Sequence, residues 1–163
     1  MQATIADMKT AEVRFNEAKV LLQKHPTVDP GRIAAIGYCF GGGTILHMAR
    51  QGSDLSGVVS FHGSLMTKTP AQTSQVKANI LVLNGTDDPF VTAEQITAFK
   101  QEMKAVGAEL EFVSYPGAKH SFTNSDADKL GKQFNMPLAY NAKADKDSWQ
   151  RMQQFLKRVF KKK

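Results

Sequence analysis

A glycine-rich stretch, GYCFGG at residues 37–42, restricts the fold of this chain more than any other part of its sequence. It overlaps the end of RIAAIGY, a short apolar run that begins after a Pro-Gly turn signal and is typical of a buried strand. The residues that follow, GTILHMAR, are typical of a helix. The chain must therefore turn sharply and lift the side chain of Cys39 off the end of the sheet. We expect Gly37 and Gly41, which lack Cβ atoms, to make room for this turn.

The position of Cys39 favours a reactive thiol. A cysteine at a helix N-terminus lies near the positive end of the helix dipole and near unpaired N–H groups, and both favour the thiolate. The same amides, beginning with that of Phe40, are expected to form an oxyanion hole when the sulfur attacks a carbonyl carbon. The pattern is a nucleophile elbow with cysteine in the serine position. The alternative is a buried, unreactive cysteine on a glycine-rich turn.

The 163 residues are enough for one domain with its own core and too few for two ordinary domains. An apolar content of 42% is typical of a globular protein, and the apolar runs are too short to cross a membrane. Much of the net charge of +6 lies in residues 157–163, without a nucleic-acid-binding motif. We therefore expect neither a membrane nor a nucleic acid as partner. The single cysteine excludes an intrachain disulfide and fits a reducing, cytoplasmic compartment.

The apolar patterns predict an α/β fold in which helices cover a mainly parallel sheet, as three layers. Short apolar or alternating runs predict strands, at residues 32–38, 57–61, 79–83 and 109–115. Helical spacing or the absence of Gly and Pro predicts helices, at residues 3–24, 43–50, 92–106 and 147–160. The last helix is expected to pack an apolar stripe that includes Trp149 into the core. Residues 121–147 show no period, and we expect a long loop there that lids the site.

Four loops follow the carboxyl ends of the predicted strands, where reactive groups gather in a parallel sheet. These loops carry Cys39, His62, Asp88 and His120. A cysteine nucleophile needs a base, and the base needs an acceptor that orients it. His120 is the candidate base and Asp88 the candidate acid, with Asp87 as a competing acid. Nucleophile, acid and histidine follow one another in the order that α/β-hydrolases use.

Three motifs resemble the dienelactone hydrolase family. They are GYCFGG at residues 37–42, LNGTDDPFV at 83–91 and YPGAKHSF at 115–122. The resemblance runs through nearly the whole chain and implies an α/β-hydrolase that cleaves ester or lactone bonds through an acyl-enzyme, without a metal or cofactor. By position it implies Cys39 as nucleophile, His120 as base and Asp88 as orienting acid. The family's Gly-x-x-Asp spacing, read from Gly85, favours Asp88 over Asp87.

We expect a small-molecule ester or lactone to bind among five side chains in or beside these motifs: Tyr38, His62, Phe90, Phe122 and Asn124. By resemblance, the family members that cleave dienelactone carry a second carboxylate-binding arginine at the position of Asn124. A neutral amide binds an anionic lactone less well than a guanidinium does. Dienelactone itself is therefore not the expected substrate.

Members of this family carry a further N-terminal portion before the region where this chain begins. By resemblance, that portion supplies the second oxyanion-hole amide, an acidic partner for the resting cysteine and an arginine for the substrate. We therefore treat residues 1–163 as a single, N-terminally truncated α/β-hydrolase domain. The strand at residues 32–38 then has an open edge, which predicts a homodimer through that edge or a fragment of a longer protein.

Two other interpretations remain. The first, as an alternative to an active hydrolase, is a catalytically inactive α/β-hydrolase remnant that acts in protein association. Its basis is that half an oxyanion hole costs on the order of a hundredfold in rate. Turnover that depends on Cys39 discriminates between these two. A thiol-based redox protein is less favoured, since the chain has no second cysteine to resolve a disulfide.

Overall fold

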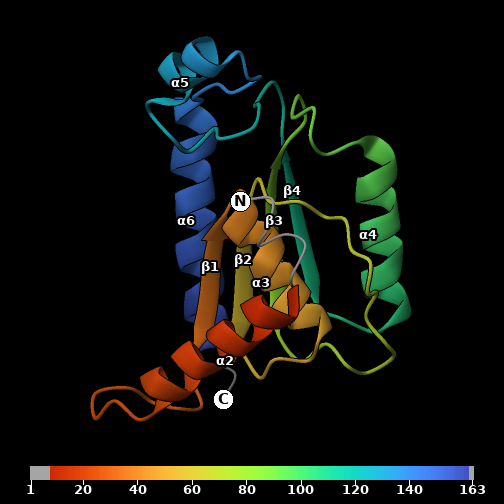
Figure 1. Cartoon of the computed structure of the whole chain (residues 1–163), viewed down its shortest axis with the longest axis vertical. Coiled ribbons are helices and arrows are strands. Elements are labelled where there is room, and N and C mark those ends of the chain that lie inside the picture. The colour runs from red at the N-terminus through yellow and green to blue at the C-terminus, as the bar shows by residue number, and fades with distance from the viewer. Residues whose placement is uncertain (1–7, 162–163) are drawn as a thin grey trace.

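The computed structural model describes residues 8–161, which form a four-stranded parallel sheet and the helices that flank it (Figure 1). The elements follow one another as α2 (Met8–Gln23), β1 (Ala34–Tyr38), α3 (Phe40–Arg50), β2 (Gly57–Phe61), β3 (Asn79–Gly85), α4 (Ala93–Ala105), β4 (Leu110–Tyr115), α5 (Ala127–Phe134) and α6 (Ala142–Val159). The strand order in the sheet is β1-β2-β3-β4, and every neighbouring pair is parallel. The predicted fold class and strands are confirmed.

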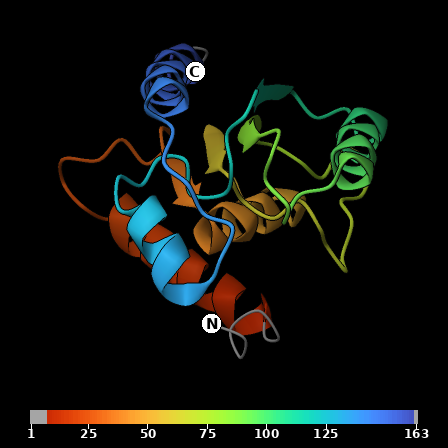
Figure 2. The ribbon, with the colours of Figure 1, turned by 90° about the horizontal axis from the view of Figure 1, so that it is seen from above.

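The sheet lies between two helical layers, as Figure 2 shows from above. Helices α2, α3 and α4 lie on one side, and α6 covers the other face. Alternate residues of each strand point to opposite faces, so each central strand supplies two cores. Val58, Ile80 and Val82 pack towards α3 and α4. Val59 and Leu81 belong to the second core, which α6 closes.

Two predictions about the C-terminal third were wrong. Residues 121–147 are not one long loop, because they contain α5 and the beginning of α6. The side chain of Asn141 caps α6 by accepting a hydrogen bond from the Ala144 N–H at 3.0 Å. Charged residues on the outer face hid this start, whereas Ala144 and Ser148 face inwards. Trp149 is 51% exposed, since the buried stripe of α6 runs through Ser148, Met152 and Phe155 instead.

Strand β1 is an edge strand within the part of the chain that the structure describes. It pairs only with β2, and two of its side chains remain open, Ile36 at 43% and Tyr38 at 42% exposure. The N–H of Cys39 donates to the Phe61 carbonyl of β2. Because the backbone groups of successive strand residues point to alternate sides, those of Ile36 and Tyr38 point away from β2. The open edge that the sequence predicts is therefore present.

A buried ion pair braces the helix that follows Cys39. Arg50, at the end of α3, is 1% exposed and donates from Nε and Nη2 to the two carboxylate oxygens of Glu102 on α4, each at 2.9 Å. Nη2 also donates to the Leu65 carbonyl at 2.8 Å, and Glu102 accepts from the Ala71 N–H at 2.9 Å. The pair thus joins α3, α4 and the connection after β2.

Replacing Glu102 with glutamine should lower the free energy of unfolding by about 3 kcal/mol, because it leaves the Arg50 charge buried and unpaired. Urea unfolding measures this change. Glu111→Gln is the matched control, since its ion pair with Arg158 is exposed and should contribute less than about 0.5 kcal/mol. Equal effects of the two substitutions would contradict the role of the brace.

Candidate active site

Cys39 occupies the turn between β1 and α3 in a backbone conformation that non-glycine residues rarely adopt. Its φ is 51° and its ψ is −118°. Its N–H donates to the Phe61 carbonyl at 3.0 Å, and its own carbonyl accepts from the Gly43 N–H at 3.2 Å. These bonds hold the strained turn in place, and strain of this kind is found mostly at functional sites.

The tight packing of this turn depends on Gly37, as predicted, but not on Gly41. A Cβ atom on Gly37 would lie 2.3 Å from the Gly41 carbonyl oxygen, whereas a Cβ on Gly41 would meet nothing within 4 Å. The prediction for Gly41 was therefore wrong. Gly42 is the second crowded position, since its Cβ would lie 2.6 Å from the Ser60 hydroxyl of β2. Helix α3 can thus approach β1 and β2 closely.

Gly37→Ala and Gly41→Ala form a matched pair that tests this packing. The first should destabilise the fold by more than about 2 kcal/mol, because a methyl group collides with backbone. The second should leave stability unchanged or raise it by up to about 1 kcal/mol, because alanine favours a helix. Thermal unfolding of both variants compares them, and an equal loss of stability would contradict the packing described.

His120 connects Cys39 to Asp88 through two hydrogen bonds. Its Nε2 lies 3.1 Å from the Cys39 sulfur, and its Nδ1 lies 2.8 Å from Asp88 Oδ2. A carboxylate can only accept, so Nδ1 carries a proton and Nε2 faces the sulfur. The other carboxylate oxygen of Asp88 accepts from the Phe90 N–H at 2.9 Å, and Asp88 is buried. The three side chains therefore form one continuous hydrogen-bonded chain.

Backbone hydrogen bonds between two loops bring Asp88 and His120 together. After β3, the Thr86 N–H donates to the Tyr115 carbonyl at 3.0 Å, and the Asp87 N–H donates to the Ala118 carbonyl at 3.0 Å. The turn after β4 is thus fixed against the turn after β3. Asp87 is exposed and accepts from the Thr86 hydroxyl, so of the two candidate acids only Asp88 reaches His120.

Four of the five predicted pocket residues form a cluster of rings around His120, in which two contact the His120 ring and two contact the His62 ring. The rings of Phe90 and His62 each meet the His120 ring edge-on, with centroids 5.0 Å apart. Phe122 meets His62 at 5.3 Å but is fully buried, so it supports the site from the core. Tyr38, 6.0 Å from His62, is partly open to solvent.

Asn124 is the fifth predicted pocket residue, and within residues 8–161 its side chain makes no hydrogen bond to the residues around His120. It is exposed, and its side-chain oxygen accepts from the Asp126 N–H at 3.0 Å. Thr123 was not predicted as a site residue, and its hydroxyl lies 3.0 Å from His62 Nε2. No motif marks this threonine, and only the fold places it beside His62.

The segment that follows the His120 loop runs alongside it. The Ala139 N–H donates to the His120 carbonyl at 3.3 Å, and the Asn141 N–H donates to the Phe122 carbonyl at 3.1 Å. Helix α5 lies beyond this segment, at the top of Figure 1. The side chain of Phe134 at the end of α5 is exposed. That this region lids the site stays a prediction.

The His62 ring is held in its neutral form. Burial first, and the neighbouring His120 second, lower the pKa of His62 to about 4. Its Nδ1 is buried and has no hydrogen-bond partner within residues 8–161. A positive charge on the His62 ring, beside His120, is therefore disfavoured.

The neutral His62 makes stability depend on pH in a defined window. In the unfolded chain this histidine takes up a proton below about pH 6.5. The contribution of His62 to the free energy of unfolding is therefore fully present above about pH 6.5. The free energy of unfolding should fall by about 3 kcal/mol as the pH drops towards 4. Urea unfolding across this range measures the slope, and His62→Phe should flatten it. The same slope in both proteins would contradict a buried, neutral His62.

No group of three or more histidine, cysteine, aspartate or glutamate side chains within residues 8–161 could hold a metal ion. None of the helices described is long and apolar enough to cross a bilayer.

Comparison with known proteins gives the family. The sequence profile of the dienelactone hydrolase family matches residues 2–160. The chain belongs to the dienelactone hydrolase family. A carboxymethylenebutenolidase-like protein of Saccharolobus solfataricus is 32% identical to this dienelactone hydrolase family member over 157 residues, which are 94% of this chain and 54% of that protein. A protein of Caenorhabditis elegans is 33% identical over 152 residues, 90% of this chain and 92% of its own length.

Two solved structures resemble this dienelactone hydrolase family member closely. A dienelactone hydrolase-like promiscuous phosphotriesterase from metagenomic libraries is 33% identical with a TM-score of 0.87. The protein m3DLH is 35% identical with a TM-score of 0.89. In both cases the match covers 98% of this chain and 65% of the other. The chain thus spans less than two thirds of these structures and little more than half of the Saccharolobus solfataricus relative. Family membership supports a hydrolase function on ester or lactone bonds.

Proposed function

We propose that this chain hydrolyses carboxylic ester or lactone bonds through a triad of Cys39, His120 and Asp88. The observation that carries the proposal is the pair of hydrogen bonds at His120, 3.1 Å to the sulfur and 2.8 Å to the carboxylate. Such a chain lets one imidazole take the thiol proton and return it to a leaving group. Membership of the dienelactone hydrolase family supports the same reaction class.

The proposed reaction has two halves. The thiol proton moves to His120 Nε2, and the Cys39 sulfur attacks the ester carbonyl to form a tetrahedral oxyanion. The oxyanion collapses, the C–O bond breaks, and the leaving alkoxide takes the proton from Nε2, which leaves a thioester on Cys39. Water then gives a proton to Nε2 and attacks the thioester carbonyl. The second oxyanion collapses, the C–S bond breaks, and the leaving sulfur takes back the proton from Nε2 as the acid product forms.

Asp88 and the start of α3 stabilise the charges in this scheme. Asp88 is buried and accepts from Nδ1, so it fixes the ring orientation and stabilises the imidazolium that forms twice per turnover. The Phe40 amide, at the first position of α3, is the proposed oxyanion donor, since the first amides of a helix have no partner within the helix. We assign one oxyanion donor to this chain.

A second candidate function follows from the length comparison. The chain covers 65% of each of the two solved structures described above. An α/β-hydrolase domain of this extent that has one oxyanion donor would lose on the order of a hundredfold in rate. It would then act through protein association rather than catalysis. The activity measurements below separate the two functions.

Cys39→Ala is the first test. The purified chain should hydrolyse p-nitrophenyl acetate, and the variant should fall to the uncatalysed rate, because the attacking sulfur is gone. A circular dichroism spectrum of the variant verifies that it is folded. Turnover that survives the substitution would overturn the proposal, and the absence of turnover in both proteins would favour the inactive remnant.

Asp88→Asn and Asp87→Asn test the assignment of the acid. The first should lower kcat by on the order of a thousandfold, since an amide no longer fixes the His120 ring in its reactive orientation. The second should leave kcat unchanged, because Asp87 is exposed and does not contact His120. Steady-state kinetics on the same ester measure both. A larger loss from Asp87→Asn would reverse the assignment.

A further inference from the structure

Helix α2 is attached to the domain through one face only. None of its residues is fully buried. On its inner face Phe15 packs against the core, and Glu12 Oε1 lies 2.6 Å from Nε2 of the buried His47 on α3. The helix therefore has a defined inner side, and its opposite side faces away from the domain, in front of α3 and β1 in Figure 1.

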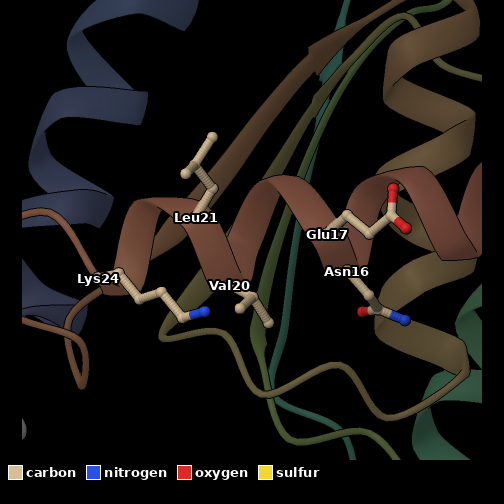
Figure 3. A pocket seen from close by; sticks show the side chains of 5 residues that line it. All are labelled: Asn16, Glu17, Val20, Leu21 and Lys24. Atoms are coloured by element: carbon tan, nitrogen blue, oxygen red, sulfur yellow. The ribbon is translucent and has the colours of Figure 1, made fainter.

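The outer face of α2 carries an apolar stripe of three side chains, two of which lie between the opposite charges of Glu17 and Lys24. Val13, Val20 and Leu21 are 56%, 46% and 74% exposed. An open hollow runs along this face, lined by Asn16, Glu17, Val20, Leu21 and Lys24 (Figure 3). Three exposed apolar side chains on one face of a surface helix are typical of a contact site.

The stripe is complementary to itself. If two copies of α2 pack antiparallel about a two-fold axis between Val20 and Leu21, each of these residues faces the other in the partner copy. Glu17 and Lys24 lie equally far from that axis, about 5 Å along the helix at 1.5 Å per residue. Each glutamate then faces the lysine of the partner copy. Within residues 8–161, neither charge has an ion-pair partner of its own.

We propose that a second copy of this chain binds to the outer face of α2, antiparallel, with Val20 and Leu21 at the centre and Glu17 paired with Lys24 at both ends. This inference does not depend on the proposed hydrolase activity. It differs from pairing through the edge of β1, because that edge presents Ile36 and Tyr38 without a charged pair to fix a partner. A single helix pair is a small interface, so we expect weak association, in which the dimer forms at micromolar concentrations of the chain.

Sedimentation velocity on the full chain over a range of micromolar concentrations tests the proposal. The wild type should sediment as a dimer, and Leu21→Glu as a monomer. Glu17→Lys and Lys24→Glu should each weaken the dimer by about tenfold or more, because each places like charges opposite one another. The double variant Glu17→Lys/Lys24→Glu should recover it, since the pairs are restored with reversed signs. Lys104→Glu, a charge reversal on α4, is the control and should have no effect.

Circular dichroism on every variant establishes that a loss of association is not a loss of folding. A monomeric wild type at these concentrations would overturn the proposal. So would single charge reversals without effect, or a double variant that is as weak as the singles. A dimer that Ile36→Lys dissociates and Leu21→Glu does not would also overturn it, in favour of pairing through the β1 edge.

Discussion

The close approach of α3 to the end of the sheet is the constraint on which the site depends. Only a residue without a Cβ fits at Gly37, where that atom would lie 2.3 Å from a backbone oxygen, and Gly42 meets the same limit against β2. Because α3 starts so close to β1, Cys39 takes a strained conformation with its φ at 51°. Its side chain stands at the edge of the sheet, beside the first free amides of the helix. The brace between Arg50 and Glu102 fixes the other end of the same helix.

The parallel sheet then supplies the partners of Cys39. Its four strands end at the same edge, so loops that are distant in the sequence meet there. The turns after β3 and β4 are fixed to each other by backbone hydrogen bonds, which leave Asp88 and His120 2.8 Å apart. The neutral, buried His62 fills the space beside His120 without adding a charge. Of these two neighbouring rings, His120 is the one that contacts both Cys39 and Asp88.

Much of this arrangement follows from the sequence, because strand ends and turn residues are local signals. The order of Cys39, Asp88 and His120 and the strands before them could be predicted from apolar runs and turns. The choice between Asp87 and Asp88 could not be made from the residues alone, since adjacent side chains differ only in which one faces inwards. Helix α5 and the start of α6 were missed because charged residues dominate their exposed faces. Spacing also suggested Gly41, whereas three-dimensional packing makes Gly42 the crowded position.

In the proposed mechanism, Cys39 and His120 act as one unit. The most direct measurement is the rate of Cys39 alkylation by iodoacetamide as a function of pH, in the wild type and in His120→Ala. We predict that the wild-type thiol reacts rapidly well below about pH 8.5, where a free cysteine ionises, and that His120→Ala moves the reaction to alkaline pH. An identical pH dependence in the two proteins, with slow reaction at neutral pH, would show that His120 does not activate Cys39.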